Sequence, residues 1–203
     1  LSIDTYLPSF PLLAASLGVS AETVEVGKVK FPTQVDVAGQ RLVLSGAGIR
    51  TKAIFKVYAA ALYLKAPATT TEAVLSQAGP KRIDIHMLRE VDGNELGKLF
   101  TKGMEANAPR DELARSVNGI LKLSELFAAR KALVEGDFFS VDYVPGVGST
   151  VLLNGKPSGI EPIKEPEFFA SLLKIWLGHA PADAQLKDAL LGKAPAPRDP
   201  FNN

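Results

Sequence analysis

The sequence contains no cysteine, which excludes thiol nucleophiles and thiolate metal ligands. It holds only two histidines, His86 and His179, which are far apart and have no nearby carboxylate pattern. Neither a metal site nor a catalytic triad is therefore expected. The glycines at 46, 48, 146 and 148 do not open a helix after a strand, so a phosphate-binding loop is not expected either. The sequence predicts a protein without metal or cofactor.

An excess of either charge is also lacking. Lys and Arg number 23 against 22 Asp and Glu, a formal net charge of +1, and no long run of one sign occurs. A nucleic-acid-binding surface needs clustered basic residues, so no nucleic-acid partner is expected. No stretch reaches the roughly eighteen consecutive apolar residues of a transmembrane span. These absences favour a small apolar partner.

One domain is the natural expectation for a chain of 203 residues. Residues 1–22 carry no sustained apolar period and contain two prolines, so we predict an N-terminal appendage outside the core. Residues 23–192 form the predicted domain. The Pro-rich residues 193–203 are predicted to be a mobile tail.

The strongest strand signal is Ile54 to Leu64, which has no Gly or Pro and is aromatic, β-branched or small almost throughout. Such a run is typical of a strand buried on both faces, so we place it at the centre of the sheet. Alternation or turn residues predict further strands at 24–31, 34–37, 41–44, 81–88 and 138–143, with a hairpin turn at 154–155.

Helical spacing of apolar residues predicts helices at about 72–76, 92–107, 109–136, 168–177 and 182–191. The third of these is expected to bury a stripe of Leu113, Val117, Ile120, Leu121 and Phe127. This order of elements predicts an α+β fold, with a mostly antiparallel sheet of six or seven strands covered on one face by helices.

Two motifs resemble a known family. Gly-Ala-Gly-Ile-Arg at 46–50 and Phe-Lys-Val-Tyr-Ala-Ala-Ala-Leu-Tyr-Leu at 55–64 are similar to the signature of the chalcone isomerase-like family. That family includes plant chalcone isomerases, fatty-acid-binding relatives and bacterial members. The resemblance extends over residues 26–191 and implies an open-faced β-sandwich with a helical layer over its large sheet. It also implies a periplasmic or secreted location, with the cytoplasm as the alternative.

Arg50 and Tyr58 match the family's positions for binding a phenolate or a carboxylate. On one continuous strand the two residues would lie roughly 26 Å apart, so they meet only if the chain turns between them. A turn centred on Ile54 would place 52 opposite 56 and 50 opposite 58. The alternatives are an ordinary surface arginine and a core tyrosine bonded to backbone.

The resemblance also shows departures from the isomerases. Their catalytic tyrosine and asparagine on the long helix align with Leu96 and Gly103, which can neither donate a proton nor order a water. No hydroxyl residue occurs between 163 and 170, where a late family hydroxyl is expected. These departures favour binding over cyclisation.

We therefore hypothesise a monomeric protein that binds a fatty acid or similar apolar carboxylate between sheet and helices. Arg50 and Tyr58 would hold the head group. The tail would be lined by residues of the long helix and of a later one, namely Leu96, Phe100, Gly103, Met104 and Phe169. One alternative is an isomerase that closes a ring by intramolecular addition, with Arg50 stabilising the oxyanion. Another is an interaction module without a ligand.

Overall fold

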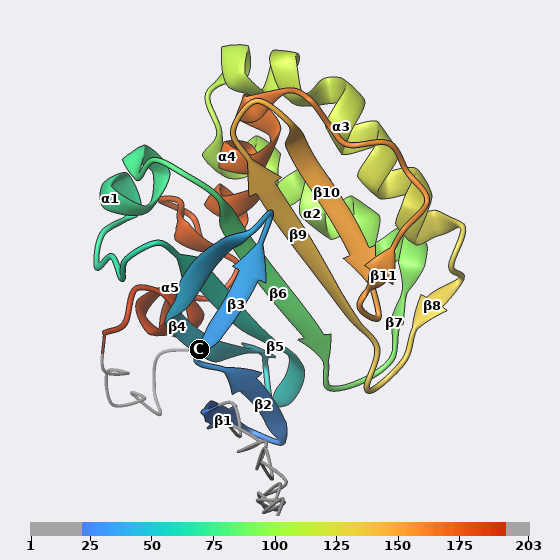
Figure 1. Ribbon diagram of the computed structural model, residues 1–203. Helices are drawn as coiled ribbons and strands as arrows, with labels where there is room; N and C mark the ends of the chain where they lie inside the picture. The colour runs from blue at the N-terminus through green and yellow to red at the C-terminus, as the bar shows by residue number, and fades with distance from the viewer. Residues whose placement is uncertain (1–21, 194–203) are drawn as a thin grey trace, which may run out of the picture.

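The computed structural model describes residues 22–193 (Figure 1). Residues 1–21 and 194–203 lie outside the described part, and with them almost all of the predicted appendage and tail. A seven-stranded sheet in the order β11-β10-β9-β6-β5-β4-β3 forms the centre of the fold, and every neighbouring pair is antiparallel. Helices α2, α3 and α4 lie on one side of this sheet. The α+β prediction is confirmed.

The elements alternate hairpins with helical segments. The strands are β1 (Thr23–Val26), β2 (Val29–Pro32), β3 (Gln34–Val37), β4 (Gln40–Lys52), β5 (Phe55–Leu64), β6 (Lys81–Met87), β7 (Val91–Asp92), β8 (Ala132–Leu133), β9 (Phe138–Val144), β10 (Gly148–Leu153) and β11 (Lys156–Pro157). The helices are α1 (Thr71–Ser76), α2 (Gly93–Asn107), α3 (Arg110–Ala128), α4 (Pro166–Leu177) and α5 (Ala184–Leu190).

Strand β5 is buried on both faces, as its sequence predicts. Its even-numbered residues from Tyr58 to Leu64 join the core beneath the helices. Ala59, Ala61 and Tyr63 face the other side, where Phe31 of β2 covers them. The prediction of one strand over 24–31 is wrong, because Gly27 adopts a positive φ of 65° and turns the chain into the β1–β2 hairpin. The β1–β2 hairpin thereby covers β5 on the face of the sheet opposite the helices.

Helix α5 packs directly on β4, and two glycines make this approach possible. A Cβ on Gly46 would lie 2.1 Å from the Ala189 carbonyl oxygen, and one on Gly48 would lie 2.6 Å from the Ala189 Cβ. The close contact brings the N-cap of α5, Asp183, to the same strand, where its Oδ2 accepts a hydrogen bond of 2.9 Å from the Thr51 amide. The end of β4 that carries Arg50 is thereby fixed to the C-terminal helices.

Helix α3 packs against α2 and α4, and only one narrow face of it is buried. Val117 and Leu121, predicted to be core residues, are 48% and 55% exposed. The buried positions are instead Ser116, Gly119, Leu123 and Phe127. A Cβ on Gly119 would meet the Phe168 ring at 2.5 Å, so the two helices approach too closely there for a broad apolar stripe.

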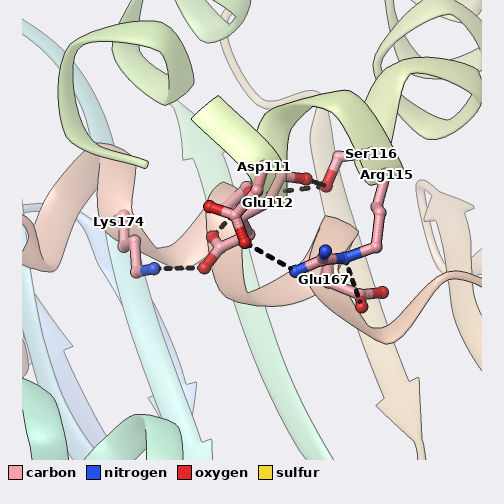
Figure 2. A network of polar contacts seen from close by, with 7 residues as sticks. Asp111, Glu112, Arg115, Ser116, Glu167 and Lys174 are labelled. Carbon is pink, nitrogen blue, oxygen red and sulfur yellow. Dashed lines mark hydrogen bonds and ion pairs between the residues drawn. The ribbon is translucent and has the colours of Figure 1, made fainter. Parts of the chain in front are cut away.

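Polar contacts hold α3 to α4 (Figure 2). The Glu112 carboxylate accepts hydrogen bonds from Ser171 Oγ at 2.6 Å and from Lys174 Nζ at 2.5 Å. Arg115 binds Glu167 of α4 at 2.8 Å and Asp111 of its own helix at 3.0 Å. The side chains of Glu112 and Lys174 are only 15% and 16% exposed, so this ion pair is largely shielded from water.

His86 is half-buried between two aromatic rings. Its ring stacks on Phe138 at 4.7 Å and meets the Phe31 ring edge-on at 4.9 Å. This burial lowers the pKa of the imidazole from 6.5 to about 4. Between these values the unfolded chain binds a proton at His86 that the folded protein excludes, so the contribution of His86 to the free energy of unfolding falls as the pH falls.

We expect His86 to reduce the free energy of unfolding by about 1 to 2 kcal/mol between pH 7 and pH 5. His86→Phe keeps the ring contacts and should remove this part of the pH dependence. Urea unfolding of both proteins at several pH values measures the difference. Parallel pH profiles for the two proteins would contradict the assignment.

Candidate functional site

The β4–β5 hairpin brings Arg50 and Tyr58 together. The two residues are direct partners in the antiparallel register, so the predicted pairing of 50 with 58 is confirmed. The rest of the predicted turn is wrong, because Lys52 pairs with Phe55 and Thr51 with Lys56. Ala53 and Ile54 form a tighter turn, with Ala53 at a positive φ of 52°. A register shift between Arg50 and Thr51 then restores the pairing.

Tyr58 is buried beneath the helices, with 2% of its surface exposed. Its hydroxyl oxygen accepts a hydrogen bond of 2.7 Å from the Trp176 indole, so its partner is a side chain of α4 and not the backbone. Burial raises the pKa of Tyr58 to about 12, although the nearby Arg50 charge and the bond from Trp176 act in the opposite direction. The hydroxyl therefore keeps its hydrogen at neutral pH.

Arg50 lies beside this tyrosine and has no acidic partner among residues 22–193. Its guanidinium carbon is 5.7 Å from the centre of the Tyr58 ring. Its Nε is buried and makes no hydrogen bond. Asp183 is close by in the fold, but its two oxygens accept the amides of Thr51, Gln185 and Leu186. A buried guanidinium nitrogen without an acceptor is unfavourable, and an anionic ligand would relieve it.

Arg50 opens onto a pocket of about 430 Å³ between the hairpin and the start of α2. Its apolar lining comes from Ala53, Phe55, Val57, Val91 and Leu99, and its charged lining from Arg50, Lys52, Arg89, Glu90, Asp92 and Glu95. Among these acids, Asp92 caps α2 by accepting the Glu95 amide at 2.9 Å. The pocket thus joins apolar walls to the unpaired guanidinium.

The other predicted site residues lie elsewhere. Leu96, Phe100 and Met104 are buried in the core between sheet and helices, where the Phe100 ring meets Trp176 edge-on at 5.6 Å. A Cβ on Gly103 would lie 3.0 Å from Ile175, so this glycine sits where α2 crosses α4. None of these four residues lines the Arg50 pocket, whereas their neighbour Leu99 does.

Phe169 lies at a second pocket of about 450 Å³, which Leu75, Lys81 and Leu173 also line. Its ring stacks on Tyr143 at 5.3 Å. The buried Lys81 ammonium donates to the Gln77 carbonyl at 2.5 Å and faces the Tyr143 ring. Desolvation lowers the Lys81 pKa. Phe169 therefore lies in a different pocket from Arg50.

Within residues 22–193, no three His, Asp or Glu side chains gather as a metal site. No helix in this part of the chain has the length and apolarity to cross a membrane. The Arg50 pocket offers three basic side chains, three acidic side chains and apolar walls, while Tyr58 is buried beside Arg50 and does not itself line the pocket. Within this set, the guanidinium of Arg50, whose Nε has no acceptor, is the group that suits an apolar anion.

A family model described as chalcone isomerase-like matches residues 23–192. The chain belongs to the chalcone isomerase-like family. No curated protein sequence matches it. Among solved structures, a fatty-acid binding protein of Arabidopsis thaliana is similar, with a TM-score of 0.61 and 16% identity, covering 84% of this chain and 96% of that one. At this identity the likeness establishes a shared fold, and it agrees with the predicted chalcone isomerase-like architecture.

Sequence reasoning missed four residues that shape this member of the chalcone isomerase-like family. Trp176 orients the Tyr58 hydroxyl, Asp183 ties β4 to α5, and Arg89 and Leu99 line the pocket. Arg89 stands in a short charged cluster before α2, which is the one signal that sequence alone offered. The others carry no local pattern that separates them from core residues or helix caps.

Proposed function

We propose that this protein binds a fatty acid or a similar apolar carboxylate, with the carboxylate held by Arg50 and Tyr58. The observation that carries the proposal is the Arg50 guanidinium, which has a buried, unpaired Nε and no acidic partner among the described residues. Its planar fork matches the geometry of a carboxylate. Further support comes from the Arabidopsis thaliana protein of the same fold, which is a fatty-acid binding protein.

The surroundings of Arg50 suit such a ligand. The pocket volume of about 430 Å³ is within the usual range for small-molecule sites. Phe55, Val57 and Leu99 supply apolar contacts for the first part of an alkyl chain. Because burial keeps Tyr58 protonated, its hydroxyl has a hydrogen to offer a carboxylate while its oxygen accepts from Trp176.

The charge of the ligand provides the test. Calorimetry should show tight binding of palmitate to the protein and markedly weaker binding of methyl palmitate, which has the same chain but no charge. Native mass spectrometry of protein purified from cells should reveal a bound lipid acid. Equal affinity for the acid and its ester, or no binding of either, would overturn the proposal.

The hydroxyl of Tyr58 is expected to contribute one hydrogen bond. Tyr58→Phe should therefore weaken palmitate binding by about 1 kcal/mol. Tyr63→Phe is the matched control, because Tyr63 lies on the same strand and donates to the Pro32 carbonyl on the opposite face of the sheet. Calorimetry on both variants measures the difference. A loss as large in Tyr63→Phe would mean that the effect comes from general destabilisation.

The isomerase alternative predicts turnover of a chalcone at this site. Leu96 is buried and Gly103 packs against Ile175, and neither side chain can donate a proton. Such donors are typically worth about 10²–10⁴ in rate, so we expect no turnover above the uncatalysed rate. The absorbance of a chalcone mixed with purified protein tests this. Saturable loss of the absorbance that Arg50→Ala abolishes would favour the isomerase instead.

A further inference from the structure

The tip of the β4–β5 hairpin exposes two large apolar side chains. Ile54 is 84% exposed and Phe55 is 54% exposed, so Ile54 is the most exposed large hydrophobic residue in the described part of the chain. They lie at a tight turn, with Ala53 before them in the left-handed region. The hairpin thus presents an apolar end to the solvent at the mouth of the Arg50 pocket.

Basic residues surround this apolar end. Residues 51–57 contain Lys52 and Lys56 and no acidic residue. Lys52 and Lys56 are exposed. Arg89 from the neighbouring loop places its guanidinium over the Phe55 ring at 4.9 Å. Three exposed acidic residues, Glu90, Asp92 and Glu95, also line the pocket, but they belong to the segment before α2 and the first turn of that helix and not to the hairpin tip.

This combination matches the surface of an anionic bilayer. Exposed Ile and Phe side chains gain free energy by entering the boundary between head groups and acyl chains. Lysine and arginine beside them extend their apolar stems and place their charges at the lipid phosphates. A tip without acidic residues meets no repulsion from such a surface.

The pocket and the tip share residues, since Lys52, Ala53 and Phe55 line the Arg50 pocket. We propose that the hairpin tip docks this protein on an anionic phospholipid surface, so that the mouth of the pocket faces the bilayer. A fatty acid in a bilayer carries its carboxylate at the same depth as the lipid head groups. Exchange of the acid through the tip rests on the proposed function, whereas the docking itself does not.

The docking is tested by sedimentation of the protein with vesicles of phosphatidylcholine and of an equimolar mixture with phosphatidylglycerol. The wild type should bind the mixed vesicles and bind phosphatidylcholine weakly. Ile54→Ser should reduce binding about tenfold, and Lys56→Gln about fivefold. Neither residue lines the pocket. Added salt should weaken the binding of the wild type more than that of Lys56→Gln.

Leu121→Ser and Lys98→Gln are the matched controls, because Leu121 is 55% exposed on α3 and Lys98 is exposed on α2. Both should bind vesicles like the wild type. Equal losses in these controls, or mixed-vesicle binding unchanged by Ile54→Ser, would overturn the docking. Loss of self-association in Ile54→Ser, measured by analytical ultracentrifugation without lipid, would overturn it in favour of a second copy as the partner.

A comparison of Arg50→Ala with Ile54→Ser separates docking from ligand binding. Arg50→Ala should bind mixed vesicles like the wild type, while Ile54→Ser should bind dissolved palmitate with unchanged affinity. The rate at which palmitate moves from mixed vesicles to the protein should fall about tenfold in Ile54→Ser. An unchanged transfer rate would overturn exchange through the tip, whatever the affinity for palmitate proves to be.

Discussion

Arg50→Ala is expected to weaken palmitate binding by about 2–5 kcal/mol, which is roughly thirtyfold to several thousandfold in affinity. The variant removes the guanidinium whose Nε is buried without a partner and leaves the ligand's carboxylate in a partly dehydrated pocket. The preference for palmitate over its methyl ester should disappear with it. Calorimetry with both ligands measures the change.

Arg41→Ala is the control for this experiment. Arg41 is an exposed residue of the same strand, pairs with Asp36 in the register and lies far from the pocket. Arg50→Lys is informative as well, because it keeps the charge but loses the planar fork, and its affinity should fall between those of the wild type and Arg50→Ala. Unchanged affinity in Arg50→Ala would contradict the proposed role of this residue.

Glu112→Ala is expected to reduce the free energy of unfolding by roughly 3 kcal/mol. The substitution leaves Lys174, whose side chain is only 16% exposed, with no acidic partner. It also removes the acceptor of the Ser171 hydroxyl. Leaving one charge unpaired and partly buried costs more free energy than the intact ion pair contributes to stability. Chemical denaturation followed by circular dichroism provides the measurement.

Asp111→Ala provides the matched control, because Asp111 is the preceding residue of α3 and its ion pair with Arg115 lies in solvent. It should leave the unfolding curve almost unchanged. The double variant Glu112→Leu/Lys174→Met removes both charges and should recover much of the lost stability. A double variant as unstable as Glu112→Ala would show that packing, and not the unpaired charge, causes the loss.

Local chemistry made much of the fold predictable. The hydroxyl of Thr70 and the carboxylate of Asp92 cap α1 and α2 where the sequence predicts their starts, because a cap depends on residues within one turn. The unbroken run of β5 identified the central strand for a similar reason. Val117 and Leu121 were mistaken for core residues because helical periodicity shows which side of a helix is apolar but not how wide the covered strip is.

The candidate site was predictable only in part. The pairing of Arg50 with Tyr58 followed from the family motif and from the need for a turn, although Ala53 in a left-handed conformation gives no sequence signal. Trp176 reaches Tyr58 across 118 residues, and Asp183 reaches Thr51 across 132. Such pairs depend on how the helices pack on the sheet, and the spacing of residues in the sequence does not predict that packing.

The attachment of α5 to β4 has a consequence for the order in which the protein matures. Ribosomes deliver the hairpin with Arg50 and Tyr58 more than a hundred residues before its partners, since Trp176 follows Tyr58 by 118 residues and Asp183 follows Thr51 by 132. A nascent chain that stops before α4 leaves the apolar face of β5 uncovered and the Tyr58 hydroxyl without its donor. Folding of the site therefore waits for α4 and α5, and until then the growing chain exposes apolar surface of its sheet.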